Sequence, residues 1–510
     1  MMHGRGKSDS AIVAVKPANK AVPTAAELVE PRAGAKGNAC QQSTCRAQDR
    51  VSVSQALERI RQDARERKKE KFISLFHHIS VELLEAAFYE LKTDAAAGVD
   101  RLTWKDYEAD FDDKIEDLHD RVQRGAYRAL PSRRVYIPKP DGRQRPLAVV
   151  ALEDKIVQRA VVALLNAIYE EDFLGFSYGF RPKRGQHDAL DALVVGITTR
   201  KVNFILDADI RSYFDTVNQA WLIRFLKHRI NDPRMIRLIQ KWLKAGILED
   251  GIVTINETGT GQGSVVSPLL ANVYLHYVFD LWAERWRRRE ASGDMIIVRY
   301  ADDIIVGFQY ETDARRFWDA MRERLAEYSL SLHPEKTCLI EFGRFAAHQR
   351  ARRGLGKPET FNFLGFTFIC GRSRRGRFAL KRKSRGDRMR AKLQEIKKEM
   401  QRRMHQPIPE QGKWLRQVAT GFFAYHAVPT NSRALHTFRH RVTDLWRRSL
   451  RRRSQKDRMT WSRIKKLADD FLPQARILHP WPHARFAVKH PRWEPSALIG
   501  HARICVGGAQ

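Results

Sequence analysis

Apolar residues recur at helical spacing in several long stretches of the chain. This period predicts an amphipathic helix over 81–91 and several further helices. A charged helix is predicted before them, from Gln55 to about Glu70. The other predicted helices cover 153–169, 219–245, 313–328, 380–404 and 411–468. Residues 1–54 lack any period and are rich in Ala, Gly, Ser, Lys and Pro, so we expect a disordered basic leader there. From Pro473 onward we expect irregular chain.

Short runs of β-branched and aromatic residues between these helices predict strands. The stretch from Arg133 to Arg145 predicts two strands around a Pro-Asp-Gly turn, with basic residues lining the hairpin. Val202–Asp209 predicts a buried strand that ends in a carboxylate. Ile296–Phe308 predicts two strands with Tyr-Ala-Asp-Asp at their turn, and the stretch from Phe361 predicts another strand.

The paired Asp302 and Asp303 are the most informative polar residues. Acidic residues are ordinary turn formers, so a solvated hairpin turn is one interpretation. Asp209 at the end of a strand could likewise cap a helix. If the three carboxylates meet, their mutual repulsion requires a cation, and hard cations such as Mg²⁺ prefer oxygen ligands. Two such ions suit nucleotidyl transfer, which needs positioning and charge neutralisation more than covalent chemistry from the protein.

The charge balance predicts a polyanionic partner. The 510 residues contain 92 Lys and Arg against 59 Asp and Glu, a net charge of +33. Two stretches, 371–404 and 439–466, contribute +12 and +10 of this excess. Nucleic acid is therefore the expected partner. No apolar run is long enough to suggest a membrane span, so no membrane partner is expected.

The five cysteines are scattered and odd in number. Cys40 and Cys45 have the spacing of metal ligands, but no second Cys/His pair lies near them. We interpret all five as free thiols in a reducing cytoplasm.

Five motifs occur in one order: Ser-Tyr-Gly-Phe-Arg-Pro, Asp-Ile-Arg-Ser-Tyr-Phe-Asp, Gly-Gln-Gly-Ser-Val-Val-Ser-Pro-Leu-Leu-Ala-Asn, Tyr-Ala-Asp-Asp and Phe-Asn-Phe-Leu-Gly-Phe. In their residues and their order along the chain, these motifs resemble those of the reverse transcriptases encoded by bacterial group II introns. The resemblance covers about 72–468. It implies an α+β right-hand polymerase, with fingers and a palm built on an antiparallel sheet, followed by a helical basic thumb or maturase domain.

The resemblance also implies roles for individual residues. Asp209, Asp302 and Asp303 match the catalytic carboxylates that bind two Mg²⁺ ions, with the Ile210 carbonyl also on a metal. Phe214 matches an aromatic residue that excludes a ribose 2′-hydroxyl. The remaining nucleotide-binding positions are Lys139, Arg145, Gln262 and Lys336. Primer and template contacts are implied for Gly98, Asp100, Arg181, Gly263, Phe363, Leu364 and Gly365. Intron RNA contacts are expected from Arg382, Lys383, Arg385, Arg447, Arg448, Arg451 and Arg452.

The implied domains follow from the same comparison. They are a leader over 1–54, a helical extension over 55–130, fingers and palm over 131–370, thumb over 371–472 and a basic tail over 473–510. Partners would be group II intron RNA, an RNA template with its DNA primer, deoxynucleoside triphosphates and a DNA target. The family often has Pro where Gly261 stands and Gly where Ser264 stands. No endonuclease domain with paired cysteines is expected, because Cys505 alone follows Cys370.

Three functions remain open from the sequence. The first is an RNA-directed DNA polymerase that also assists intron splicing and mobility. The second is an RNA-binding maturase without polymerase activity, and intact Asp209, Asp302 and Asp303 argue against it. The third is a domesticated reverse transcriptase in phage defence or repair. The oligomeric state is not specified by the sequence.

Overall fold

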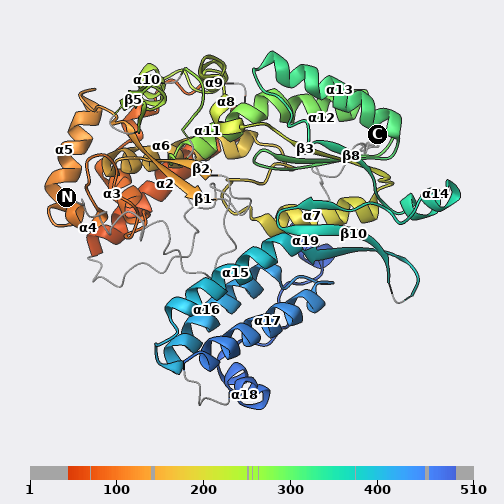
Figure 1. The fold of residues 1–510 in the computed structure, drawn as a ribbon. Helices are drawn as coiled ribbons and strands as arrows, with labels where there is room; N and C mark the ends of the chain where they lie inside the picture. The colour runs from red at the N-terminus through yellow and green to blue at the C-terminus, as the bar shows by residue number, and fades with distance from the viewer. Residues whose placement is uncertain are drawn as a thin grey trace, which may run out of the picture.

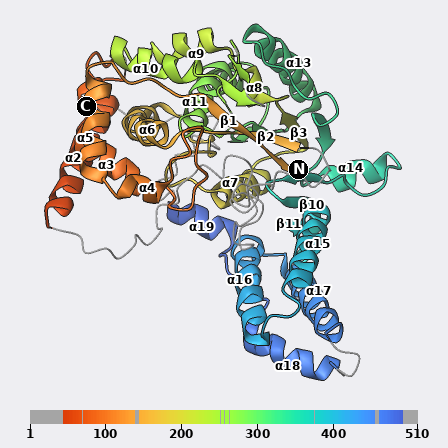
Figure 2. The ribbon, with the colours of Figure 1, turned by 60° about the vertical axis from the view of Figure 1, so that its left-hand side comes forward.

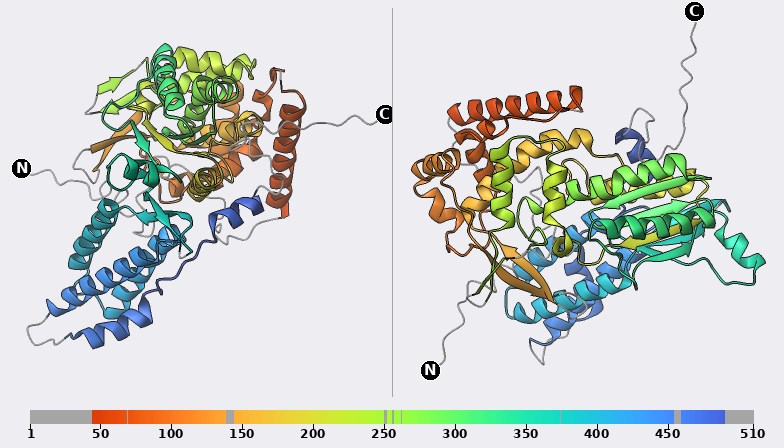
Figure 3. Two further views of the ribbon diagram at one scale, coloured as in Figure 1. Left: turned by 90° about the vertical axis from the view of Figure 1, so that its right-hand side faces the viewer. Right: turned by 90° about the horizontal axis from the view of Figure 1, so that it is seen from above.

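The computed structural model describes residues 44–68, 70–138, 144–249, 252–255, 257–261, 263–373, 375–453 and 459–489. These form an upper body of helices and sheets and a lower helical lobe, which projects from it as an elongated unit in the side view of Figure 3. No helix among the described residues is long and apolar enough to cross a membrane. The lobe and the body have separate apolar cores, and most of the chain contributes to the larger one.

Helices precede the first sheet and cover one side of the body (Figure 1). They are α2 (Thr44–Glu66), α3 (Val81–Tyr89), α4 (Trp104–Glu108) and α5 (Phe111–Gln123). The predicted helix at 55–70 therefore begins eleven residues earlier, inside the segment expected to be a disordered leader. Ser80 caps α3 by accepting a hydrogen bond from the Leu83 amide, which explains where that predicted helix starts.

The fingers sheet has the strand order β2-β1-β4-β5. The basic hairpin predicted from the sequence is confirmed as β1 (Ser132–Pro138) and β2 (Gln144–Val149), which pair antiparallel. Strands β4 (Ile247–Glu249) and β5 (Ile252–Thr254) complete the sheet. Helices α6 (Leu152–Asp172), α9 (Gln219–Leu226) and α10 (Pro233–Leu243) lie where the apolar spacing predicts helices, whereas α7 (Gln186–Thr199) was not predicted.

The palm sheet is antiparallel throughout and has the order β6-β7-β3-β8. Its strands are β3 (Phe204–Asp209), β6 (Met295–Tyr300), β7 (Asp303–Phe308) and β8 (Cys338–Glu341), so the predicted double-Asp hairpin is confirmed. Helices α11 (Ser267–Leu275), α12 (Leu281–Arg289) and α13 (Glu311–Glu327) belong to the same body, with the π-helical turn η2 (His276–Asp280) between α11 and α12. The predicted mixed α+β fold with an antiparallel palm is thus observed.

A third sheet joins the palm to the helical lobe, in the order β11-β10-β9. Its strands are β9 (Phe361–Phe363), β10 (Phe366–Arg372) and β11 (Phe378–Ser384). The prediction that 380–404 is helical is wrong for its first residues. In β11, buried Leu380, Arg382 and Ser384 alternate with exposed Lys381 and Lys383, which is the period of a strand. Helix α15 begins only at Gly386.

The helical lobe consists of α15 (Gly386–Arg402), α16 (Ile408–His426), α17 (Ser432–Arg451) and α18 (Trp461–Phe471). Its core begins at Met389 and includes Ile396 and Trp446, whereas Phe366, Phe368 and Leu380 pack in the larger core. The boundary expected at 371 therefore lies near 385. The tail expected to be irregular contains α19 (Pro482–Lys489), which lies against α7 (Figure 2).

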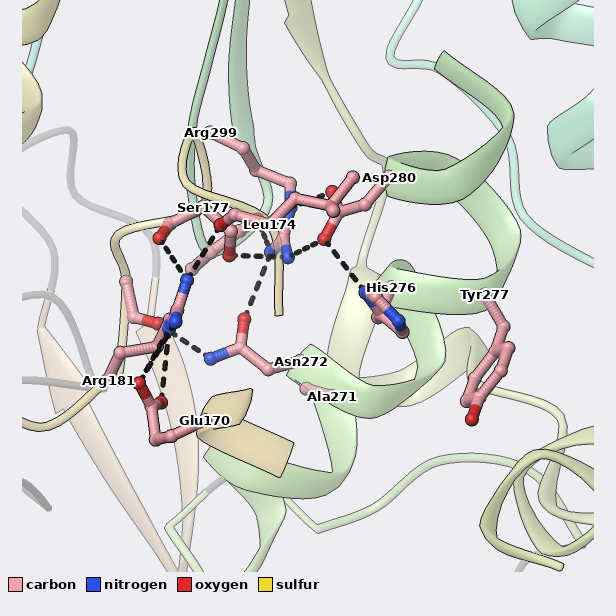
Figure 4. A network of polar contacts seen from close by, with 12 residues as sticks. Glu170, Leu174, Ser177, Arg181, Ala271, Asn272, His276, Tyr277, Asp280 and Arg299 are labelled. Atoms are coloured by element: carbon pink, nitrogen blue, oxygen red, sulfur yellow. Dashed lines mark hydrogen bonds and ion pairs between the residues drawn. The ribbon is translucent and has the colours of Figure 1, made fainter. Parts of the chain in front are cut away.

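A buried polar network is centred on Arg299, three residues before the double-Asp turn (Figure 4). Arg299 on β6 is fully buried and donates to both carboxylate oxygens of Asp280, at 2.7 and 2.6 Å. It also donates to the Ser177 hydroxyl at 2.7 Å, the Asn272 amide oxygen at 3.0 Å and the Ala301 carbonyl at 3.1 Å. One guanidinium thereby ties the turn to α11, to η2 and to the loop before α7.

We expect Arg299→Ala to be strongly destabilising, because it leaves the buried Asp280 carboxylate without its partner. The expected loss in the free energy of unfolding is about 3–5 kcal/mol, measured by urea denaturation followed by tryptophan fluorescence. Arg315→Ala is the control, because the Arg315 side chain is 65% exposed and pairs with Glu311 one helical turn away. Its expected loss is below about 1 kcal/mol. Equal losses in the two variants would contradict the structural role of Arg299.

Candidate active site

The three carboxylates predicted to be catalytic meet at one end of the palm sheet. Asp209 is the last residue of β3 and Asp303 the first of β7, and the register pairs them directly across the two strands. Opposed residues in an antiparallel pair have Cα atoms about 4.5–5.5 Å apart. Asp302 occupies the turn between β6 and β7, next to Ala301, whose φ of 58° is left-handed. Residues more than ninety positions apart in sequence are therefore neighbours, as the motif pattern requires.

These carboxylates raise one another's pKa values. Burial raises the pKa of Asp303, and the neighbouring charges of Asp302, Asp209 and Asp207 raise it further. The pKa of Asp302 is also raised, first by burial and then by Asp209. Burial and the Asp209 charge raise the pKa of Asp207 to about 7. The end of the sheet thus concentrates negative charge that a cation would stabilise.

A loop before β8 supplies one such cation. The Lys336 ammonium lies 2.5 Å from Asp209 Oδ2, and this lysine is about half exposed. The same loop holds Asp209 by its backbone: the His333 amide donates to the Asp209 carbonyl at 2.7 Å, and the Asp209 amide donates to the Thr337 hydroxyl at 3.4 Å. Ile210, the predicted carbonyl ligand, is buried and forms a bridge with Leu332 in this loop.

The donor chemistry at this site fits a hard divalent cation. Asp209, Asp302 and Asp303 offer carboxylate oxygens only, which Mg²⁺ prefers. Within the described ranges, however, no group of three or more His, Cys, Asp and Glu side chains converges as ready metal ligands. The ammonium of Lys336 occupies the position beside Asp209 instead. The residue types therefore suit the ion, while the Asp209 carboxylate is paired with a lysine.

The basic hairpin brings positive charge to the same place. Arg145 on β2 pairs with Ile137 on β1, and its charge acts to lower the pKa of Asp302. Lys139 in the turn of this hairpin lies outside the described residues, as does Gln262. Arg145 and Lys336 thus provide two cationic side chains near the carboxylates, one from the fingers and one from the palm.

The Gly-rich loop before α11 is fitted tightly against the fingers. A Cβ on Gly263 would stand 2.4 Å from the Ala148 carbonyl oxygen, and the Gly263 φ of +119° is one that L side chains rarely adopt. Next to it, the Ser264 hydroxyl donates to the Gln158 side-chain oxygen at 2.8 Å. The serine that departs from the family pattern therefore anchors the loop to α6.

Phe214 follows the strand end on the short helix α8 (Tyr213–Thr216). Its ring meets that of Phe180 edge to face at a centroid distance of 6.2 Å. The Phe214 carbonyl accepts a hydrogen bond from the Thr260 amide at 2.9 Å, which joins α8 to the Gly-rich loop. The side chain is partly exposed, so a face remains for a ligand.

The turn between β9 and β10 has the geometry of a tight hairpin. Leu364 and Gly365 have φ values of 44° and 80°, as a two-residue type I′ turn requires. Phe363 is buried below the turn, and the Leu364 carbonyl accepts a hydrogen bond from the Tyr425 hydroxyl of α16 at 2.7 Å. The predicted primer-contacting turn is thus held from the helical lobe.

The segment near Gly98 is fitted in the same close manner. A Cβ on Gly98 would stand 2.5 Å from Ala151 Cα, so the backbone passes directly over the start of α6. Asp100 is exposed, and its carboxylate accepts a hydrogen bond from the Leu102 amide at 3.3 Å. The loop after Gly98 is therefore exposed to solvent at Asp100 and Arg101, and the template contact there stays a prediction.

Three arginines assigned to nucleic acid are used inside the protein instead. Arg181 is buried and forms a bidentate pair with Glu170, while also donating to the carbonyls of Leu174 and Ser177 (Figure 4). Arg382 is buried against Asp191 at 2.9 Å. Arg447 is largely covered, beside Asp444 and over the Trp461 ring. Their guanidinium groups pair with carboxylates of the protein and so are not presented to nucleic acid.

The other predicted RNA contacts remain available on the surface. Lys383, Arg448, Arg451 and Arg452 are exposed, and Arg385 is partly exposed beside Asp387. Sequence analysis missed the residues that support the site from within, among them Arg299, Asp280, Thr337 and Tyr425. The sequence offered one signal of this internal support: Arg299 is a charged residue, next to the Tyr-Ala-Asp-Asp motif, within an otherwise apolar strand.

Comparison with known proteins agrees with this geometry. Residues 137–368 match the family "Reverse transcriptase (RNA-dependent DNA polymerase)". Protein YkfC of Escherichia coli K12 is 37% identical over 217 residues, 42% of this chain and 57% of that protein. Group II intron-encoded protein LtrA of Lactococcus lactis is 33% identical over 222 residues, 43% of this chain and 37% of that protein. An uncharacterized 91 kDa protein in the cob intron of Schizosaccharomyces pombe is 38% identical over 164 residues, 32% of this chain and 20% of that protein.

Each of these matches spans less than two thirds of the relative's length, and all of them cover a minority of this chain. The matched family segment contains the strand end at Asp209, the hairpin at Asp302 and the turn at Leu364. Residues 137–368 therefore match a reverse transcriptase domain, and this part of the chain is similar to a protein encoded by a group II intron.

Proposed function

We propose that this protein is an RNA-directed DNA polymerase of a group II intron, which copies RNA into DNA and binds intron RNA to assist splicing and mobility. The observation that carries the proposal is the direct pairing of Asp209 with Asp303 beside Asp302. A binding protein gains nothing from three clustered anions facing RNA, whereas nucleotidyl transfer needs them. The substrates would be deoxynucleoside triphosphates and an RNA template with a DNA primer.

The carboxylates would hold two Mg²⁺ ions, with Asp209, Asp302 and Asp303 as ligands and the Ile210 carbonyl as a further donor. Such ions activate a 3′-hydroxyl and stabilise a pyrophosphate leaving group. The protein's own contribution is positioning and charge. Arg145 and Lys336 neutralise the triphosphate, together with Lys139, and Lys336 leaves Asp209 to do so. Gln262 and Gly263 would contact the incoming nucleotide, and the 363–365 turn would support the primer.

The two separate apolar cores support a division into domains. Residues 131 to about 385 are proposed as fingers and palm, with the helical extension before them contacting template near Gly98 and Asp100. The helical lobe, from about 386 to 472, is proposed as the thumb or maturase domain. Its exposed Lys and Arg residues would bind the phosphates of intron RNA.

We expect Asp302→Asn to abolish primer extension, because a negatively charged carboxylate of the metal site becomes a neutral amide. The assay extends a labelled DNA primer on an RNA template with Mg²⁺, and a loss of about 10³-fold or more is expected. Arg315→Gln on α13 is the matched surface control and should extend normally. Wild-type protein that binds RNA but extends no primer would support the maturase without polymerase activity instead.

We expect Phe214→Ala to weaken selection against ribonucleotides, because the Phe214 ring would contact a 2′-hydroxyl. Its ring is partly exposed beside Phe180, and the smaller side chain opens this space. The measurement is the ratio of kcat/KM for a deoxynucleotide to that for the matching ribonucleotide, which should fall about tenfold or more. Phe180→Leu serves as a packing control. An unchanged ratio in Phe214→Ala would remove the assignment.

We expect replacement of the three exposed arginines Arg448, Arg451 and Arg452 by Gln to make RNA binding less salt-dependent. Each lost phosphate contact should reduce the log–log slope of affinity against salt by roughly 0.7–0.9. The matched control replaces Arg285, Arg289 and Arg315, which are equally exposed on α12 and α13. If both triple variants change the slope equally, RNA does not bind at the end of α17.

A further inference from the structure

A buried charge cluster joins three segments that lie far apart in sequence. Asp191 on α7 has a side chain that is only 2% exposed. Arg382 on β11 donates to one of its carboxylate oxygens at 2.9 Å, and Arg485 on α19 donates to the other at 2.5 Å. A single carboxylate therefore balances two guanidinium groups. Removing its charge would leave both cations uncompensated at a site with little water.

The C-terminal strap, residues 472–489, crosses the junction between the body and the helical lobe. Figure 3 shows the chain leaving α18 at the far end of the lobe and returning along it to α19. The Arg439 guanidinium of α17 donates to the Pro473 carbonyl at 3.1 Å. Near the body, the amides of Leu478 and His479 both donate to the Ala427 carbonyl, at 2.9 and 3.1 Å. The strap is thus fastened to the lobe at Pro473 and again at Leu478 and His479, before α19 reaches the body.

His479 connects the strap to the charge cluster. Its Nε2 lies 2.7 Å from the Ala424 carbonyl of α16, and its Nδ1 lies 2.9 Å from the Arg485 guanidinium. These partners assign the tautomer with the proton on Nε2. The ring also packs against His187 of α7 at a centroid distance of 4.0 Å. One imidazole therefore contacts the lobe, the strap and the body.

Helix α16, which receives these contacts, also reaches the 363–365 turn. The Tyr425 hydroxyl donates to the Leu364 carbonyl at 2.7 Å, and its ring lies 5.1 Å from His187 and 5.6 Å from Phe366. The end of α16 is thus clamped between the turn on one side and α7 with the strap on the other. A continuous series of contacts runs through Asp191, Arg485, His479, His187, Tyr425 and Leu364.

We propose that the C-terminal strap is a latch that fixes the helical lobe to the palm, and that Asp191 and Tyr425 are positioning residues for the 363–365 turn. The lobe has its own core and is joined to the body by the link from β11 to α15, by the strap, and by hydrogen bonds from the Arg382 and Ser384 amides of β11 to the Thr430 and Asn431 side chains. Contacts at its base therefore set its orientation. This inference rests on the proposed function, because the turn supports a primer only in a polymerase.

The test uses full-length Asp191→Asn in primer extension with a heparin trap. The rate of the first nucleotide addition at saturating primer–template should stay within about twofold, because Asp191 touches no reacting group. The number of nucleotides added per binding event should fall about fivefold or more, as expected for a loss of coupling between distant sites. Tyr425→Phe, which removes only a hydroxyl, should shift the product lengths in the same direction.

The double variant should lose less than the two single variants combined, since both act on one series of contacts. Amide hydrogen exchange without substrate provides a second readout: exchange at 478–489 and 364–365 should rise in Asp191→Asn. The matched control is Asp172→Asn, which breaks another buried pair, with Arg229 at 2.8 Å, between α6 and the chain after α9. It should leave product lengths and exchange at these positions unchanged.

Three outcomes would overturn the latch: product lengths equal in Asp191→Asn and Asp172→Asn, a slowed first addition with unchanged processivity, or unchanged exchange in the strap. Should Asp191→Asn fail to fold, Tyr425→Phe carries the same test through product length. A wild-type protein that extends no primer would refute the proposed function, while hydrogen exchange would still report on the latch.

Discussion

The register of β3 against β7 is the constraint on which the site depends. It places Asp209 opposite Asp303, although like charges on opposed positions destabilise a sheet. A shift by one residue would turn Asp209 to the other face and bury different side chains, so the apolar residues of both strands resist it. Arg299 adds a second restraint, because it holds the Ala301 carbonyl of the turn from below. Apolar packing of the two strands and the buried Arg299–Asp280 ion pair therefore offset the repulsion between the Asp209 and Asp303 carboxylates.

Much of this arrangement could be predicted from local sequence. Apolar runs of β-branched residues mark β3, β6 and β7, and a carboxylate at the end of such a run has few other places to lie. Partners from distant segments could not be predicted. Nothing near Asp191 indicates that Arg382 and Arg485 meet it, since these residues are separated by more than 190 positions. The same limit applies to Asp280 beneath the turn.

The misassigned arginines have one physical cause. A basic residue in a loop pairs equally well with a phosphate or with a carboxylate of the protein, and sequence alone does not separate the two. Arg181 pairs with Glu170, and Arg382 with Asp191. Arg382 also explains why strand β11 was not predicted. When Arg382 is counted as a polar residue, the alternation of buried and exposed positions disappears, and 380–385 resembles the start of a basic helix. Its burial restores the two-residue period.

Buried guanidinium groups stabilise both the palm and the base of the lobe, but to different degrees. Arg299 makes five hydrogen bonds and is enclosed on all sides. Arg382 shares its carboxylate with Arg485, and its buried Nη2 has no hydrogen-bond partner among the described residues. An incompletely satisfied buried cation lowers the cost of separating the surfaces around it. The carboxylates are thereby held on a fully hydrogen-bonded buried support, while the contacts at the base of the lobe cost less to separate.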